Sequence, residues 1–281
     1  MEKYIDLHTH STCSDGSMTP SQVVEHAKKS GLAAISLTDH DTFAGVLEAV
    51  EKGNEIGMEV VPGIELSAKS ETETHILGYY VDITNKNFVD KIAEIQAQRK
   101  ERNFDTLRRI NQCGFDITFE DGAAFAGGGL VGRAHFAKAM VKKGYVSSVK
   151  EAFDKYLANG KPCYSPMQLL TSEECVSLIN GAGGVAFVAH LHLMRKSDED
   201  LYEFLKTLKG AGLCGIEGYY TEYTPELQDK YQSLARELGL LISGGTDFHA
   251  EMKPHISIGR GLGNMAIPYS VLENIKNARI K

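Results

Sequence analysis

The segment Tyr4-Ile-Asp-Leu-His-Thr-His10 near the start of the chain is a short apolar run that ends in two histidines. Such a run is typical of a buried β-strand. Side chains on a strand point to alternate faces, so His8 and His10 lie on the same side and can reach one metal ion. An isolated pair of this kind is more often incidental than functional, so the other strands decide its meaning.

Six similar runs follow, and predicted helices separate most of them. The runs are residues 33–37, 59–64, 75–81, 185–189, 215–220 and 240–243. A capped helix is expected to begin at Thr19-Pro20, and a second over residues 43–56 that ends near Gly57. Alternating strands and helices are typical of βαβ units, so the sequence predicts an α/β protein built on a parallel sheet.

Residues 85–172 break this alternation. A long charged stretch carries apolar residues at helical spacing. They are Phe88, Ile92, Ile95, Leu107 and Ile110. Short helices are expected over residues 134–143 and 149–157, whereas residues 120–132 look like a loop in which Gly127-Gly-Gly129 could act as a hinge.

A chain of 281 residues has room for two domains, or for one α/β barrel with an insertion. We expect the second arrangement. Residues 1–84 would form the first part of the barrel, residues 85–172 a mainly helical insertion that caps the substrate site, and residues 173–281 the second part.

Composition narrows the class of protein. The chain carries 30 Lys and Arg against 37 Asp and Glu, a net charge of −7, which disfavours binding of long duplex nucleic acid. It lacks an uninterrupted apolar run long enough to span a membrane and an apolar leader at the N-terminus, so a cytoplasmic location is expected. Its five cysteines are scattered without a C-x-x-C pair, which argues against a disulfide framework and a cysteine zinc site.

Histidines and carboxylates gather where the predicted strands end. They are His8, His10, Asp15, His40, Glu65, His75, His190, Asp247 and His249. The carboxyl ends of barrel strands meet on one face, so these side chains are expected in one pocket. Nine nitrogen and oxygen ligands exceed what one ion takes and suit two or three divalent ions such as Mn, Fe or Zn. Two ions about 3.5–4 Å apart can activate a hydroxide for in-line displacement at phosphorus.

These strand-end motifs, taken together, resemble the PHP (polymerase and histidinol phosphatase) family. The matching segments are His8-Thr-His10, Ser14-Asp15-Gly16, Thr38-Asp39-His40-Asp41, Gly63-Ile-Glu65, His75-Ile-Leu-Gly78, Ala189-His190 and Gly245-Thr-Asp247-Phe-His249. The resemblance implies a distorted (β/α)7 TIM-like barrel with a trinuclear metal site for phosphoester hydrolysis. It also implies a ligand set. His8, His10, Glu65 and Asp247 would hold one ion, Glu65 with His75 and His190 a second, and Asp15, His40 and His249 a third.

Within the family, the chain is most similar to the small stand-alone phosphoesterases that include nucleoside 3′,5′-bisphosphate phosphatases and a short-RNA 5′-exonuclease (RNase AM). Arg99, Arg102 and Arg133 lie in the insertion and are candidate phosphate clamps, because a guanidinium binds phosphate through two parallel hydrogen bonds. His135 could hydrogen-bond the reacting phosphoryl group. Alternatively, residues 99–109 are only the solvated face of a helix.

The chain departs from the family after the ligand His190. The usual Ala-His-Pro-Gly is replaced by Ala189-His-Leu-His192. His192 is therefore either a loop histidine or an additional substrate contact, whereas His26 and His255 are expected to be structural or surface residues.

The leading hypothesis is a metal-dependent phosphohydrolase that uses a metal-bound hydroxide on a small nucleotide, with a 3′,5′-bisphosphonucleotide favoured. Asp247, His249, His135 and Arg133 would be its catalytic residues. Trimming of short RNA or DNA oligonucleotides from the 5′ end is the close alternative. An amidohydrolase is less favoured because such sites commonly contain a metal-bridging lysine, and no lysine ends a predicted strand here. A non-catalytic PHP module would lack a ligand. The metal identity and the oligomeric state stay open.

Overall fold

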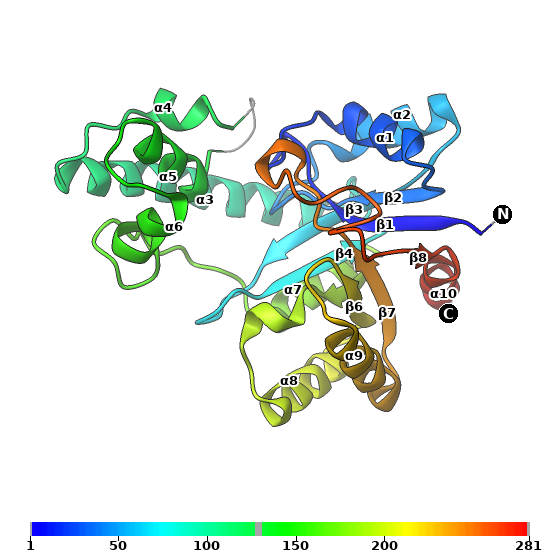
Figure 1. Cartoon of the computed structure of the whole chain (residues 1–281). Coiled ribbons are helices and arrows are strands. Elements are labelled where there is room, and N and C mark those ends of the chain that lie inside the picture. The colour runs from blue at the N-terminus through cyan, green and yellow to red at the C-terminus, as the bar shows by residue number, and fades with distance from the viewer. Residues whose placement is uncertain (1, 127–130, 280–281) are drawn as a thin grey trace.

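The computed structural model describes residues 2–126 and 131–279. Within these residues, eight strands form one sheet in the order β7-β6-β5-β4-β3-β2-β1-β8 (Figure 1). The strands are β1 (Tyr4–Thr9), β2 (Ala34–Leu37), β3 (Glu59–Ser67), β4 (His75–Tyr79), β5 (Val185–Val188), β6 (Gly215–Tyr220), β7 (Leu241–Gly245) and β8 (Ile267–Pro268). The seven predicted strands are therefore present, and the two-residue β8 is added at the edge beside β1.

The sheet is mixed rather than parallel. β1, β2 and β3 pair in parallel, as do β5, β6 and β7, but β4 runs antiparallel to both β3 and β5. The expectation of a parallel sheet is wrong at β4. Only residues 68–74 join β3 to β4, and so short a connection returns the chain antiparallel, whereas a parallel partner needs a crossover.

The two ends of the sheet approach each other beyond β7. The backbone N–H of His10 donates to the carbonyl oxygen of Phe248 at 2.9 Å, and Phe248 N–H donates back to His8 at 3.3 Å. Gly245 makes this approach possible, because a Cβ at that position would lie 2.3 Å from the Cβ of His8. The sheet thus closes almost completely into a TIM-like barrel, and the predicted fold class is confirmed.

Helices pack on the outside of this barrel. They are α1 (Pro20–Lys29), α2 (Val46–Ile56), α7 (Ser172–Gly181), α8 (Asp198–Gly210), α9 (Pro225–Leu238) and α10 (Ser270–Arg279), with the short 3-10 helices η2 (Leu191–Met194) and η3 (Ala250–Met252). The predicted start of α1 is confirmed: Thr19 and Gln22 form a reciprocal capping box. One buried cluster joins β3 and β6 to α7 and α8 through residues such as Ile64, Val176 and Ile216.

The insertion forms a separate group of helices to one side of the barrel (Figure 1). They are α3 (Lys86–Gln112), α4 (Phe119–Ala123), α5 (Arg133–Lys142), α6 (Val149–Ala152) and the π-helix η1 (Phe153–Leu157). Their own buried cluster includes Ile110, Phe136 and Leu157. Phe88, Ile92 and Ile95 in the first half of α3 belong instead to the barrel cluster, so α3 spans both cores, and the division at residues 85 and 172 stays a proposal.

One local expectation in the insertion is wrong. Residues 119–123, of which residues 120–123 were expected to be loop, form α4 because Thr118 and Asp121 build a capping box at its start. The Gly127-Gly-Gly129 segment lies outside the described residues. Across the described chain, no helix combines the length and the apolar character needed to cross a membrane.

Candidate metal centre

The structure brings the nine strand-end donors together at one end of the barrel. His8, His10 and Glu65 are fully buried, and His190, His249 and Asp247 are at most 5% exposed. Most lie at the carboxyl end of a strand or in the loop after it, and His75 begins the antiparallel strand β4, whose start lies at the same end of the barrel. His8 and Asp247, which are 239 positions apart in the sequence, are thus neighbours.

Glu65 at the end of β3 occupies the centre of the group. One carboxylate oxygen, Oε2, lies 3.2 Å from Nε2 of His8, 3.2 Å from Nε2 of His10 and 3.1 Å from Nδ1 of His40. The other oxygen, Oε1, lies 2.8 Å from Nδ1 of His75 and 3.0 Å from Nε2 of His190. A carboxylate in this position can bridge two ions.

Asp247 joins His8, His10 and Glu65 at the first candidate ion position. Its Oδ1 lies 3.5 Å from Nε2 of His8 and 3.2 Å from Nε2 of His10. A third group lies on the other side of His10, where Asp15 Oδ1 is 3.1 Å from Nε2 of His249 and Oδ2 is 3.8 Å from Nε2 of His40. Neighbouring sets share donors, because His10 also lies with the third group and His40 also lies with Glu65 and His75, so the assignment of ligands to three ions stays a prediction.

The donor atoms themselves indicate that the site fits metal ions. Among the described residues, Nε2 of His8, Nε2 of His10, Nδ1 of His40 and Oε2 of Glu65 are buried without a hydrogen-bond partner. They lie close together but lack hydrogen-bond geometry. Leaving buried polar atoms unpaired is costly, and lone pairs that converge on a cation remove that cost. An all-nitrogen-and-oxygen set suits Mn, Fe or Zn.

The charges of the carboxylates point to the same conclusion. Burial by itself would raise the pKa of Glu65, but His40, His8 and His75 outweigh it and hold that pKa well below its ordinary range. Burial is likewise outweighed at Asp247, whose pKa is held well below its ordinary range by Lys253 and neighbouring histidines. Both carboxylates are therefore ionised and can act as ligands.

The loops that carry these donors are strained and firmly supported. His190 and Asp247 have φ angles of 26° and 55°, in the left-handed region that only a few per cent of non-glycine residues adopt. Two buried aspartates hold the neighbouring backbone. Asp6 accepts hydrogen bonds from Thr246, and Asp39 accepts them from Ser11. Such strain persists only where the surroundings over-determine it, as at ligand sites.

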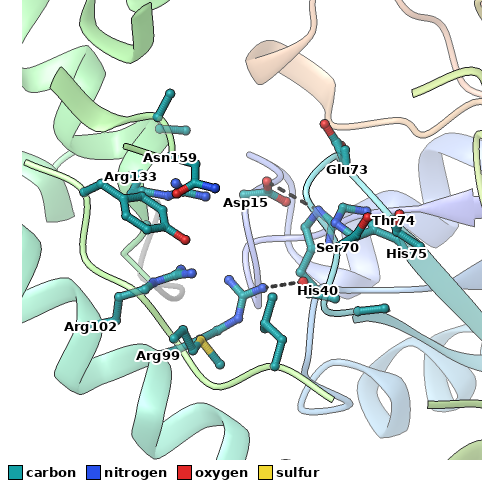
Figure 2. Close-up of a pocket in the computed structure, with 18 of the residues that line it drawn as sticks. Asp15, His40, Ser70, Glu73, Thr74, His75, Arg99, Arg102, Arg133 and Asn159 are labelled. Atoms are coloured by element: carbon teal, nitrogen blue, oxygen red, sulfur yellow. Dashed lines mark hydrogen bonds and ion pairs between the residues drawn. The ribbon is translucent and has the colours of Figure 1, made fainter. Parts of the chain in front are cut away.

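A pocket of about 510 Å³ opens beside this group, in the size range of a small-ligand site. Figure 2 shows its two sides. Asp15, His40 and His75 lie on the barrel side, and Arg102, Arg133 and Asn159 lie on the insertion side.

The three arginines of the pocket are not equivalent. Arg99 pairs with the buried Asp41 and donates to Ser67 Oγ at 2.8 Å. Because the Asp41 carboxylate already neutralises the positive charge of Arg99, a phosphate would bind Arg99 less strongly. The ion pairs of the described chain include neither Arg102 nor Arg133. Burial, reinforced by Arg99 and Arg133, lowers the pKa of Arg102 to about 9, so Arg102 stays charged at pH 7 without an anionic partner.

His135 at the start of α5 is a hydrogen-bond donor prepared by its backbone. The N–H of Gly132 donates to Nδ1 of His135 at 3.0 Å, which leaves the proton on Nε2. That Nε2 is buried and has no partner among the described residues. Burial also lowers the pKa of His135, so the ring is neutral near pH 7 and can donate to an oxygen in the pocket.

Several residues that contact the site were not predicted from the sequence. Tyr220 donates to Asp247 Oδ2 at 2.9 Å, and Lys253 donates to the same oxygen at 2.6 Å. Tyr220 ends β6 and could have been found by the strand-end rule, whereas Lys253 lies in a loop and carried no signal. Glu73 lies near His75 and His190, within reach of a shared cation.

The structure also accounts for the Leu191-His192 departure. Leucine, unlike proline, has a backbone N–H, and that of Leu191 donates to the Tyr223 hydroxyl at 2.8 Å. His192 hydrogen-bonds Glu222 at 3.0 Å and packs against the rings of Tyr220 and Tyr223. These contacts support the loop-histidine alternative.

A nearly closed α/β barrel with clustered imidazole and carboxylate donors at its strand ends defines a metal-dependent hydrolase. A family model described as the PHP domain matches residues 6–162, more than half of the chain. The chain belongs to the PHP domain family, and it is a metal-dependent phosphoesterase.

Two curated relatives cover most of the chain. It is 33% identical over 260 residues to the 5′-3′ exoribonuclease Rnm of Escherichia coli (strain K12), a match that covers 92% of this chain and 88% of that protein. It is 32% identical over 248 residues to the 3′,5′-nucleoside bisphosphate phosphatase of Chromobacterium violaceum, with 88% and 87% covered.

Two solved structures have the same fold. One is a protein from Bifidobacterium adolescentis proposed to be a metal-dependent phosphoesterase, with a TM-score of 0.84, 31% identity and coverage of 99% and 96%. The other is described as an amidohydrolase from Chromobacterium violaceum with bound sulfate and no metal, with a TM-score of 0.85, 29% identity and coverage of 98% and 96%.

Proposed function

We propose that this phosphoesterase releases phosphate from a small nucleotide, and that a 3′,5′-bisphosphonucleotide is its leading substrate. The observation that carries the proposal is the pair Arg102 and Arg133, which face the donor cluster across one small pocket and have no anionic partner among the described residues. A nucleotide with two phosphates can present one to the metal centre and the other to the arginines. The similarity to the bisphosphate phosphatase of Chromobacterium violaceum supports this choice.

The nine strand-end donors would hold two or three divalent ions, which supply Lewis acidity and the activation of water when bound. Around them, the residues of this chain bind and orient the substrate. Arg133, whose guanidinium is fixed against the rings of Phe153 and Tyr164, offers its N–H groups to a phosphate. His135 donates its Nε2 proton to an oxygen of the reacting phosphoryl group.

Asp247 and His249 have the strictest geometry of the proposed catalytic residues. Tyr220 and Lys253 hold one oxygen of Asp247, which directs the other toward His8 and His10. The Nδ1 atom of His249 donates to the backbone carbonyl oxygen of Asp247 at 2.7 Å, which leaves Nε2 free to face Asp15. Both side chains are thereby fixed as ligands before a substrate arrives.

A second candidate is the removal of nucleotides from the 5′ end of short RNA. The similarity to the Escherichia coli exoribonuclease favours it. A net charge of −7 and a pocket of about 510 Å³ favour a compact or short substrate over a long duplex, which needs an extended basic surface.

Parallel assays distinguish these substrates. Phosphate or nucleotide release is measured with Mn²⁺ from 3′,5′-bisphosphoadenosine, 5′-AMP and a short 5′-phosphorylated RNA, with Asp247→Asn as the inactive control. We expect phosphate release from the bisphosphate, which the control lacks. Mononucleotide release from RNA alone would shift the function to the exonuclease.

If the protein with bound metal releases neither phosphate nor nucleotide from any of the three substrates, the nucleotide proposal is overturned. Other phosphoesters would then be tested, followed by amides, the chemistry named for the structural neighbour from Chromobacterium violaceum. Metal that raised thermal stability without supporting any of these reactions would favour a non-catalytic module.

A further inference from the structure

A fully buried carboxylate, Glu217 in β6, lies behind the donor cluster without belonging to it. One oxygen, Oε1, lies 2.9 Å from Nδ1 of His8. The other, Oε2, accepts the backbone N–H of His190 at 2.6 Å. Glu217 therefore contacts two of the proposed ligands from the side opposite to the metal centre.

The contact with His8 decides how that ring is protonated. An ionised carboxylate oxygen only accepts, so Nδ1 of His8 carries the proton shared with Glu217, and Nε2 is the nitrogen available to a metal ion. Nε2 lies 3.2 Å from Glu65 Oε2 and 3.5 Å from Asp247 Oδ1, and it has no hydrogen-bond partner among the described residues. Glu217 thus points the coordinating nitrogen of His8 toward the centre.

The contact with His190 acts through the backbone. His190 is held at φ 26° and ψ 61°, a strained conformation that needs external support. Glu217 binds its N–H, and the next N–H, of Leu191, donates to the Tyr223 hydroxyl at 2.8 Å. Tyr223 in turn donates to the backbone carbonyl oxygen of Glu217 at 3.4 Å, so Glu217 in β6 and Tyr223 in the loop after it together support the turn that presents the His190 ring.

We propose that Glu217 is a positioning residue that orients one ligand of each of two neighbouring ion positions, His8 in the first and His190 in the second. This inference rests on the proposed metal ligands. Removing the carboxylate is expected to weaken divalent-ion binding at both positions, because partners of this kind typically contribute 10- to 100-fold in metal affinity.

The test is a titration of Mn²⁺ into metal-stripped protein, followed by calorimetry, for the wild type, Glu217→Gln and Glu222→Gln. The amide keeps the shape of Glu217, but its NH2 group cannot accept the N–H of His190 while its oxygen serves His8. We expect the Mn²⁺ dissociation constant of Glu217→Gln to rise about 10- to 100-fold. Glu222→Gln is the matched control, because Glu222 lies in the following loop, half-exposed, and bonds only His192.

The outcomes separate the two proposals. If the wild type binds no Mn²⁺, the proposed ligand set itself fails. If the wild type binds Mn²⁺ and Glu217→Gln binds it equally well, only the role of Glu217 is overturned. Thermal unfolding of the metal-free proteins adds a structural readout, since a merely structural role would lower the melting temperature and leave the Mn²⁺ affinity of the folded protein unchanged.

Tyr223→Phe keeps the inference testable if Glu217→Gln does not fold. It removes only the hydroxyl that holds the Leu191 N–H. The expected result is weaker Mn²⁺ binding at the position of His190, with the other positions unchanged. Wild-type binding at every position would contradict the support of the His190 turn by β6.

Discussion

The two sides of the pocket are built in different ways and carry opposite charge. The barrel side presents ionised carboxylates and imidazoles whose lone pairs converge, centred on Glu65 and Asp247. The insertion side presents Arg102, Arg133 and the N–H of His135, donors for which residues 2–126 and 131–279 supply no anionic partner. Cations complete the first side and an anion completes the second. A phosphate ester between them would satisfy both, which is the arrangement that the proposed function uses.

The largest expected effect comes from breaking the barrel side at its centre. Glu65→Gln removes the charge that five imidazoles share. We expect it to lose divalent-ion binding and at least about 10³ in kcat/KM, since metal ions contribute several kcal/mol of transition-state stabilisation. Elemental analysis and phosphate release check both. Glu71→Gln, an exposed carboxylate at the rim of the same pocket, should change neither.

The barrel side could be predicted from the sequence because its signals are local. His8 and His10 are two positions apart at the end of β1, so strand geometry predicts their shared direction, and Asp247 and His249 repeat the spacing just after β7. Glu217 had a weaker signal, a carboxylate within the apolar run 215–220. The antiparallel direction of β4 depended on a short connection that the strand pattern did not weigh.

The insertion side was harder to predict because helical arginines carry no distinctive spacing. Arg99 and Arg102 are three residues apart on one helix, yet Arg99 pairs with Asp41 whereas Arg102 pairs with no described carboxylate. This difference arises from contacts between α3 and the loop after β2. The spacing of residues along a helix does not predict contacts with a segment that is distant in the sequence.

That difference predicts opposite effects on stability. Arg99→Ala leaves the buried Asp41 charge unpaired, and the free energy of unfolding is expected to fall by about 3 kcal/mol. Arg102→Ala removes a charge that repels Arg99 and Arg133, so it should leave stability unchanged or raise it. Denaturant titration of both variants checks the comparison. Equal losses would contradict the distinction between the two arginines.

A smaller effect is expected when the insertion side loses its phosphate contact. Arg133→Ala should lower kcat/KM about 10- to 100-fold, the value of a charge-assisted hydrogen bond of roughly 1.5–3 kcal/mol, with Mn²⁺ binding unchanged. Steady-state kinetics with the bisphosphonucleotide measure the loss. Arg108→Ala is the control, because Arg108 is exposed and pairs with Asp105. Reduced metal content in Arg133→Ala would show that the two sides are not separable.

The smallest effect concerns His135 and pH. Burial lowers its pKa below the ordinary 6.5, so the unfolded chain takes up this proton before the folded protein does. The stability contributed by the neutral ring is therefore complete above pH 6.5 and decreases as the pH falls below it. His135→Gln should lose less stability than the wild type between pH 7.5 and pH 5, as judged by unfolding at each pH. A steeper loss in the variant would mean that the ring is not held neutral.

The central claim is that divalent ions at the strand ends, opposite the arginines, carry out phosphate release. The most direct test adds Mn²⁺ in known equivalents to metal-stripped protein and follows phosphate release from 3′,5′-bisphosphoadenosine. We predict no activity without metal and a rise that levels off at two or three equivalents per chain. Activity that is independent of added metal, or that is complete at one equivalent, would contradict the claim.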